Sequence, residues 1–232
     1  MQINEKTASM CQFRTTTPKR HNTPLETNAT DLQLKLLIAK LCNEEISGQY
    51  EYNDHNSPVF QLLFNFLRGI PCEIDNAKMV ALNGSAGTGK STIMSVFNKF
   101  LNQAYPTPNN NFVISSTEEI VRYDQKELQD SRLLFTVTVN EHGVMKRNPR
   151  NILINEFGRL YEGSNFGTQY LDVMRMFVKV RYDIYQEYGC KTHITTNYRL
   201  EQLDNIFNDS ILSDRFREMF HFVELKGKSF RK

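Results

Sequence analysis

The chain of 232 residues has no tryptophan, few cysteines and almost no net charge, with 28 lysines and arginines against 26 aspartates and glutamates. Cys11, Cys42, Cys72 and Cys190 form no C-x-x-C pair, which argues against a zinc site or a disulfide framework. No apolar run approaches the roughly 20 residues that span a bilayer, and residues 1–30 lack the apolar stretch of a secretory signal. The small net charge means that any nucleic-acid binding needs a local basic patch. These absences predict a soluble, cytoplasmic protein that does not bind membranes.

The chain separates into an N-terminal part with few large apolar residues and a longer, regularly patterned part. Residues 1–30 are rich in Thr, Asn and Pro, and the leucine spacing predicts a helix capped by Asp31 and ending near Leu41. The apolar face of this helix either packs on the rest of the chain or meets a partner. We expect residues 1–56 to form a tail with a small helical partner-binding region and residues 57–232 to form the main domain.

Beyond residue 78, short apolar stretches alternate with helical patterns. The expected strands are Met79–Asn83, Phe112–Ser115, Leu133–Val139, Ile152–Ile154, Thr192–Thr196 and Phe222–Leu225. Helices are expected at Lys90–Asn102, at Thr168–Tyr188 and in two stretches between Leu200 and Phe220. This alternation predicts a three-layer α/β fold around a mainly parallel, five-stranded sheet, with no C-terminal helical lid.

The strongest motif is Gly84-Ser85-Ala86-Gly87-Thr88-Gly89-Lys90-Ser91-Thr92, a G-x-x-x-x-G-K-[ST] match between a predicted strand and a predicted helix. Its glycines let successive backbone N–H groups point at phosphate oxygens, and the helix N-terminus adds a positive end. The Lys90 amine can reach the β- and γ-phosphates, and the Ser91 hydroxyl can ligate Mg²⁺. The motif therefore predicts a P-loop that binds ATP and Mg²⁺.

A second motif, Ile152-Leu153-Ile154-Asn155-Glu156, is an apolar strand that ends in an acidic group. Glu156 can act there as the base that orients an attacking water. Asn155 stands where most P-loop ATPases carry an aspartate that holds Mg²⁺ through water. An amide oxygen brings no negative charge, so we expect weaker magnesium binding and slow hydrolysis.

Four motifs occur in a specific order and spacing: GSAGTGKST, ILINEFG, THITTN and DRFREMFHFVELKGKSFR. Together they resemble the DnaC-type helicase-loader ATPases of the AAA+ class over about residues 60–232. Those proteins usually show an apolar strand ending in Asp-Asp or Asp-Glu, a T-S/T-N strand end, an Asp-Arg pair and a closing G-x-S-x-R. The IstB-type transposition-helper ATPases share most of these motifs. The resemblance implies an AAA+ P-loop core in residues 57–232.

The resemblance also implies roles for single residues. Lys90 and Ser91 would bind the nucleotide, Glu156 would be the catalytic glutamate, and Asn155 departs from the usual magnesium-binding aspartate. Asn197, at the end of a predicted strand, would be the sensor of the γ-phosphate or lytic water. Without the family pattern, the favoured interpretation of Asn197 is an ordinary turn residue, since asparagine is common at strand ends.

Two arginines near the end of the chain carry further implied roles. Arg215 would be the finger that a subunit offers to its neighbour's ATP, with Arg217 as the alternate. Arg231, in the closing G-x-S-x-R, would lie near the nucleotide. On their own, these residues read as solvated helix and tail charges. Lys146, Arg147 and Arg150 form a local basic cluster that is a candidate contact for single-stranded DNA.

The implied partners are a replicative DnaB-type helicase, single-stranded DNA and further copies of the chain, which would self-associate through ATP at subunit interfaces. The predicted function is an ATPase that loads or remodels the ring helicase during replication initiation. Two alternatives remain open. One is a transposition helper that acts with a transposase, and the other is a nucleotide-dependent adaptor that hydrolyses ATP weakly because of Asn155. A metabolic kinase is disfavoured, since no arginine-rich lid segment is present.

Overall fold

The computed structural model describes residues 25–46, 53–54, 56–75, 77–106, 111–122, 135–139, 145–159 and 167–227. The helices are α1 (Asp31–Ile46), α2 (Ser57–Leu67), α3 (Lys90–Ala104), α4 (Thr117–Ile120), α6 (Gly167–Tyr188), α7 (Leu200–Phe207) and α8 (Ser210–Met219). The strands are β1 (Met79–Asn83), β2 (Val113–Ser116), β3 (Phe135–Val139), β4 (Met145–Pro149), β5 (Ile152–Asn155), β6 (Thr192–Thr196) and β7 (Phe220–Glu224). Over the described ranges, no helix has the length and apolar character needed to cross a bilayer.

Five strands form one sheet in the order β2-β5-β6-β1-β7, and every pair in it is parallel. Met79 lies opposite Phe220, and Ile154 lies opposite Ile194. The predicted five-stranded parallel sheet is therefore confirmed. Because all strands run the same way, their carboxyl ends meet at one edge, which is where ligands bind in open α/β sheets.

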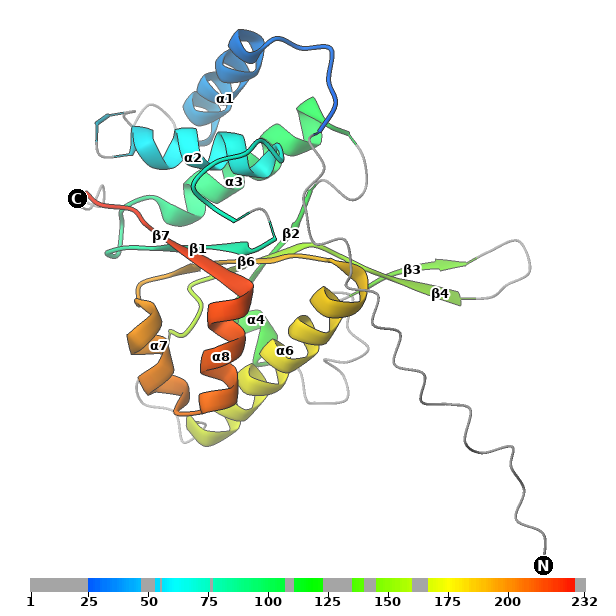
Figure 1. Ribbon diagram of the computed structural model, residues 1–232, viewed down its shortest axis with the longest axis vertical. Coiled ribbons are helices and arrows are strands. Elements are labelled where there is room, and N and C mark those ends of the chain that lie inside the picture. Colours follow the sequence, from blue (N-terminus) through cyan, green and yellow to red (C-terminus); the bar gives the residue numbers. More distant parts are fainter. Residues whose placement is uncertain are drawn as a thin grey trace, which may run out of the picture.

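The strands β3 and β4 form a separate antiparallel pair that projects from the main sheet (Figure 1). The predicted strand at Leu133–Val139 thus belongs to this hairpin and not to the sheet. Its partner β4 has the sequence Met-Lys-Arg-Asn-Pro, which carries no alternation of apolar side chains. The sequence pattern did not predict β4 for that reason.

Helices cover both faces of the sheet, with α1, α2 and α3 on one side and α4, α6, α7 and α8 on the other (Figure 1). Successive side chains of β1 point to opposite layers, as the pleat requires. Val80 and Leu82 pack with the α1–α3 layer, whereas Met79 and Ala81 pack with the α6–α8 layer. The predicted three-layer arrangement is confirmed.

Helix α1 begins one residue after its cap, which is Thr30 and not the predicted Asp31. The Gln33 amide donates to Thr30 Oγ1 over 3.3 Å, and the Thr30 amide donates to Gln33 Oε1 over 2.8 Å. This reciprocal pair is a capping box. The Asp31 carboxylate instead accepts from Arg68 Nη2 at 2.9 Å, which ties the start of α1 to the end of α2. The helix also runs five residues beyond the predicted end, to Ile46.

One face of α1 packs on the rest of the chain and another remains exposed. Leu34, Ile38 and Leu41 are buried in the cluster that also contains α2 and α3. Leu32 and Leu36, one turn apart, are 68% and 61% exposed. The helix therefore combines the two interpretations that its sequence allowed, a core-facing side and an apolar outer side.

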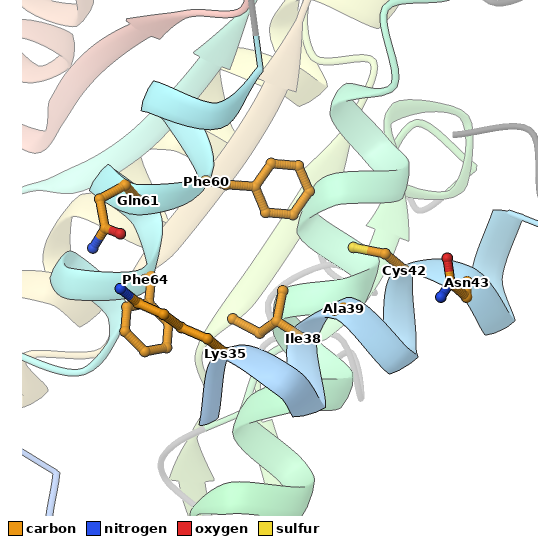
Figure 2. A pocket seen from close by; sticks show the side chains of 8 residues that line it. All are labelled: Lys35, Ile38, Ala39, Cys42, Asn43, Phe60, Gln61 and Phe64. Atoms are coloured by element: carbon orange, nitrogen blue, oxygen red, sulfur yellow. The ribbon is translucent and has the colours of Figure 1, made fainter. Parts of the chain in front are cut away.

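A cavity of about 410 Å³ lies between α1 and α2 (Figure 2). Ile38, Phe60 and Phe64 supply much of its apolar wall, and Lys35 stands at its rim with its amine 5.9 Å from the Phe64 ring centroid. Cys42 also lines it. Burial raises the pKa of the Cys42 thiol to about 11, so the thiol stays protonated at neutral pH and is a poor nucleophile.

Candidate nucleotide-binding site

The glycine-rich loop connects β1 to α3 and wraps around the N-terminus of α3. Gly84 has a φ of +152°, and a Cβ at this position would lie 2.4 Å from the Leu225 carbonyl oxygen. Gly89 caps α3 with a φ of +90°. Both positions therefore require glycine. The loop thus forms a glycine-dependent turn that leads into the N-terminus of α3, and the backbone N–H groups of such a terminus fit phosphate.

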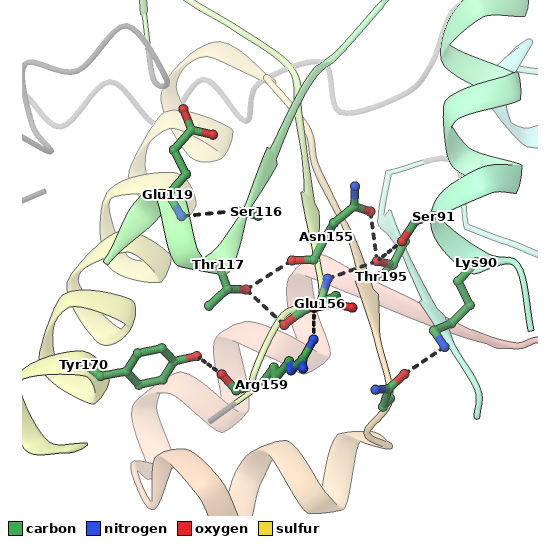
Figure 3. A network of polar contacts seen from close by, with 11 residues as sticks. Lys90, Ser91, Ser116, Thr117, Glu119, Asn155, Glu156, Arg159, Tyr170 and Thr195 are labelled. Carbon is green, nitrogen blue, oxygen red and sulfur yellow. Dashed lines mark hydrogen bonds and ion pairs between the residues drawn. The ribbon is translucent and has the colours of Figure 1, made fainter. Parts of the chain in front are cut away.

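The side chain of Lys90 links this loop to the end of β6. Its Nζ donates to the carbonyls of Gly84 and Ser85, both at 2.7 Å, and to Asn197 Oδ1 at 2.8 Å (Figure 3). Lys90 is buried, whereas Asn197 is exposed. Lys90 and Asn197, which belong to different sequence motifs and lie 107 positions apart in the chain, are thus in direct contact.

A chain of side-chain hydrogen bonds connects the loop to the end of β5. Ser91 Oγ lies 3.4 Å from Thr195 Oγ1, and the Thr195 hydroxyl donates to Asn155 Oδ1 at 3.0 Å (Figure 3). The backbone N–H of Glu156 donates to the same Thr195 oxygen at 3.2 Å. The structure therefore brings together Ser91, Asn155 and Glu156, as the sequence predicted, through a threonine that sequence reasoning did not single out.

Glu156 has a backbone conformation that is uncommon for a residue with a side chain. Its φ is +56°, in the left-handed region, and the side chain is 40% exposed. Thr117 holds this turn, since its hydroxyl contacts the carbonyl oxygens of Asn155 and Glu156 at 3.2 and 3.0 Å. Arg159 Nη1 forms an ion pair with Glu156 Oε2 at 2.5 Å. Such strained turns often occur at functional sites, where surrounding contacts maintain them.

Of the remaining predicted residues, Arg215 and Arg217 lie on α8. Arg215 packs against α6, with its guanidinium carbon 4.7 Å from the Tyr182 ring centroid, and its buried Nη1 has no hydrogen-bond partner among the described residues. Arg217 is exposed at the end of α8 and pairs with Asp204 at 2.6 Å.

The other predicted residues of the glycine-rich motif differ in exposure. Ser85 and Ala86 are exposed in the loop, Gly87 is half-buried, Thr88 is buried, and Thr92 is half-buried in α3. Arg231 lies outside the described residues, as do the side chains of Lys146 and Arg147.

The groups at this edge fit a nucleotide with a magnesium ion. The start of α3 offers N–H groups and the Lys90 amine to anionic oxygens, and the Ser91 hydroxyl, the Asn155 amide and the Glu156 carboxylate are hard oxygen donors of the kind that Mg²⁺ prefers. Within the described ranges, no cluster of three His, Cys, Asp or Glu residues could hold a metal ion. A magnesium ion here would therefore rely on phosphate oxygens for part of its coordination.

Thr117, Arg159 and Thr195 complete the site, and sequence reasoning missed all three as functional residues. The one available signal was the run of threonines before Asn197 in Thr-His-Ile-Thr-Thr-Asn. Hydroxyls near the end of a buried strand need partners, and the neighbouring strand end supplies them here.

No protein-family model and no curated protein matches the chain. Among solved structures, the DnaC helicase loader is similar with a TM-score of 0.54 and 14% identity, over 81% of this chain and 99% of that one. The fold is that of the DnaC helicase loader. A candidate primosome component from Streptococcus pyogenes serotype M3 is also similar, with a TM-score of 0.52 and 13% identity, over 84% of this chain and 98% of that one. This likeness confirms the predicted α/β fold around a parallel five-stranded sheet, and the chemistry of the site rests on the residues described above.

Proposed function

We propose that the chain is an ATPase of the DnaC-type AAA+ family that loads or remodels a replicative ring helicase on single-stranded DNA. The observation that carries this proposal is the contact between Lys90 of the glycine-rich loop and Asn197 at the end of β6, within a helicase-loader fold. This contact supports a single phosphate-binding site to which both Lys90 and Asn197 contribute.

In this proposal, the loop from Gly84 to Thr92 holds the phosphates, and Lys90 neutralises the β- and γ-phosphate charge. Ser91 and Asn155 would hold Mg²⁺, which when bound offsets charge on the phosphate oxygens. Glu156 would take a proton from the attacking water, and Asn197 would orient that water or the γ-phosphate. Arg231 would lie near the nucleotide.

Replacing Asn155 with aspartate is expected to strengthen magnesium binding and raise ATP turnover. The Asn155 oxygen already accepts from Thr195, and an aspartate can keep that bond while adding a negatively charged oxygen where the amide nitrogen stands. The apparent magnesium affinity should rise about tenfold, which corresponds to roughly 1.4 kcal/mol. Magnesium titrations of ATP turnover and of nucleotide binding check this. Unchanged values in Asn155→Asp would mean that Asn155 does not face the ion.

Arg215 remains the proposed finger to a neighbouring subunit, although its guanidinium stacks on Tyr182 of its own chain. We therefore expect Arg215→Ala to lower turnover at least tenfold at protein concentrations that favour assembly, with little effect on nucleotide binding. Arg217→Ala, which removes the ion pair with Asp204, is the matched control and should retain turnover within about twofold. The opposite order of effects would assign the finger to Arg217.

Co-elution with the replicative helicase tests the function itself. We expect the protein to form a large complex with that helicase in the presence of ATP and Mg²⁺. Because residues 1–56 are the proposed partner-binding region, the double variant Leu32→Ser/Leu36→Ser should weaken the complex. Ile211→Ser removes an equally exposed apolar side chain, 61% exposed as in Leu36, from α8 and is the matched control.

The alternatives predict other outcomes. Failure of the wild-type protein to co-elute, together with binding to a transposase and double-stranded DNA, would favour a transposition helper. A stable, ATP-dependent complex without measurable turnover would favour an adaptor. The Asn155 amide, which carries no charge, is the feature that makes the adaptor the second candidate.

A further inference from the structure

The hydrogen-bond ladder between β5 and β6 ends just before the candidate catalytic turn. The last paired residues are Ile154 and Ile194. Beyond them, Thr195 and Thr196 connect the two strand ends, and the Thr196 hydroxyl donates to the Phe157 carbonyl at 2.7 Å. Thr195 makes the contacts to Asn155 and Glu156. Its carbonyl accepts from the Phe157 N–H at 2.8 Å, and its hydroxyl contacts Asn155 and the Glu156 N–H. Thr195 is completely buried, whereas its partners Asn155 and Glu156 are half-buried.

The hydroxyl of Thr195 has one proton and two lone pairs, and the neighbouring groups account for all of them. The proton goes to Asn155 Oδ1. One lone pair accepts the Glu156 N–H, and the other faces Ser91 Oγ at 3.4 Å. Ser91 must therefore be the donor in that contact, which leaves both lone pairs of the Ser91 oxygen available to a cation.

The same bond fixes the orientation of the Asn155 amide. Because Thr195 donates to Oδ1, the amide nitrogen points away from Thr195 (Figure 3). The Glu156 N–H is held at the same time, which helps to maintain the left-handed φ of +56° at Glu156. One hydroxyl thus orients three groups on two separate segments of the chain.

We propose that Thr195 is a positioning residue that aligns Ser91, Asn155 and Glu156 for a magnesium–nucleotide complex. This inference rests on the proposed function and adds to it the residue that couples the two motifs. Thr195 itself contacts neither nucleotide nor ion in this proposal.

The test compares Thr195→Val, which keeps the shape and removes the hydroxyl, with Thr195→Ser, which keeps the hydroxyl. The matched control is Thr192→Val at the other end of β6, where the hydroxyl accepts from Arg181 and is remote from the candidate site. All three are examined with a fluorescent, non-hydrolysable ATP analogue, with and without Mg²⁺. Thermal unfolding reports the structural cost of each change.

Without Mg²⁺, we expect Thr195→Val to bind the analogue with an affinity within about twofold of the wild type. The factor by which Mg²⁺ raises this affinity should be about tenfold smaller in Thr195→Val than in the wild type. Thr195→Ser should restore most of that gain. Thr192→Val should retain it even if its melting temperature falls. The inference is overturned if Mg²⁺ raises the analogue affinity of Thr195→Val as much as that of the wild type. It is also overturned if Thr192→Val loses as much of this increase as Thr195→Val does.

Hydrogen exchange of the nucleotide-free protein gives a second measurement that does not depend on the proposed function. The Glu156 amide should exchange at least tenfold faster in Thr195→Val and unchanged in Thr192→Val. Equal exchange in the two variants would show that Thr195 does not hold the turn. Failure of the wild-type protein to bind the analogue at all would instead overturn the proposed function, which keeps the two failures distinct.

Discussion

Replacing Lys90 with methionine is expected to reduce ATP affinity at least 100-fold, equivalent to about 3 kcal/mol or more. Methionine has a similar length but carries no charge and donates no hydrogen bond. The loop amides would still face the phosphates, yet the cation that neutralises them would be gone. Lys90 is buried at the start of α3 with its amine directed at Gly84 O, Ser85 O and Asn197 Oδ1, so water cannot easily take its place.

Titration of a fluorescent ATP analogue measures this loss, and Lys99→Met is the matched control. Lys99 lies on the same helix and forms an ion pair with Glu45, so its replacement also removes a cation from α3. It should leave ATP affinity within about twofold, because Lys99 lies about two and a half turns along α3 from Lys90. If Lys90→Met binds the analogue as tightly as Lys99→Met, the loop does not hold phosphate.

Replacing Arg181 with alanine is expected to lower the free energy of unfolding by about 3–5 kcal/mol, the largest stability effect that we predict. Arg181 is only 1% exposed. It donates to Thr192 Oγ1 at 2.7 Å and to the carbonyls of Arg150 and Lys191 at 3.0 Å. In the part of the chain that the structure describes, no carboxylate forms an ion pair with it. Burial lowers its pKa to about 10, so the guanidinium remains charged at neutral pH.

Two terms oppose each other at Arg181. Its hydrogen bonds satisfy carbonyls next to the amino ends of β5 and β6, while burial of an unpaired charge costs free energy. The variant Arg181→Met separates these terms, because it refills much of the volume but makes no hydrogen bond. We expect it to lose about 2 kcal/mol, since the charge penalty disappears together with the bonds. Urea unfolding measures both variants. A Met variant as stable as the wild type would show that the hydrogen bonds only offset the buried charge.

The sequence predicted those parts of the fold whose signals are local. The strand Ile152–Ile154 is a continuous apolar run that ends in Asn-Glu, and the loop from Gly84 carries its glycines where the backbone requires them. Both signals come from adjacent residues, and both predictions of structure are confirmed. The predicted end of α1, near Leu41, was wrong because Asn43, Glu44 and Glu45 interrupt the apolar pattern without ending the helix.

Contacts between residues that are distant in the sequence could not be predicted from such local signals. Thr195 bonds to Asn155 across 40 positions, and no spacing rule along one chain reveals such a pair. Arg181 lies in a long amphipathic helix where an arginine is normally solvated, and its burial follows only from how α6 crosses the amino ends of β5 and β6. The roles of Glu156, Asn197 and Arg215 stay predictions.

The spacing of the candidate site comes from backbone hydrogen bonds and not from side-chain packing. Its groups sit at the ends of β1, β5 and β6, and neighbouring strands lie about 4.8 Å apart whatever their sequences. A lineage can therefore exchange most of its core residues, one compatible substitution at a time, while the few groups at the strand ends keep their mutual distances. This chain and the DnaC helicase loader share a fold at 14% identity, so the strand ends of such a sheet keep their spacing although most of the residues around them differ.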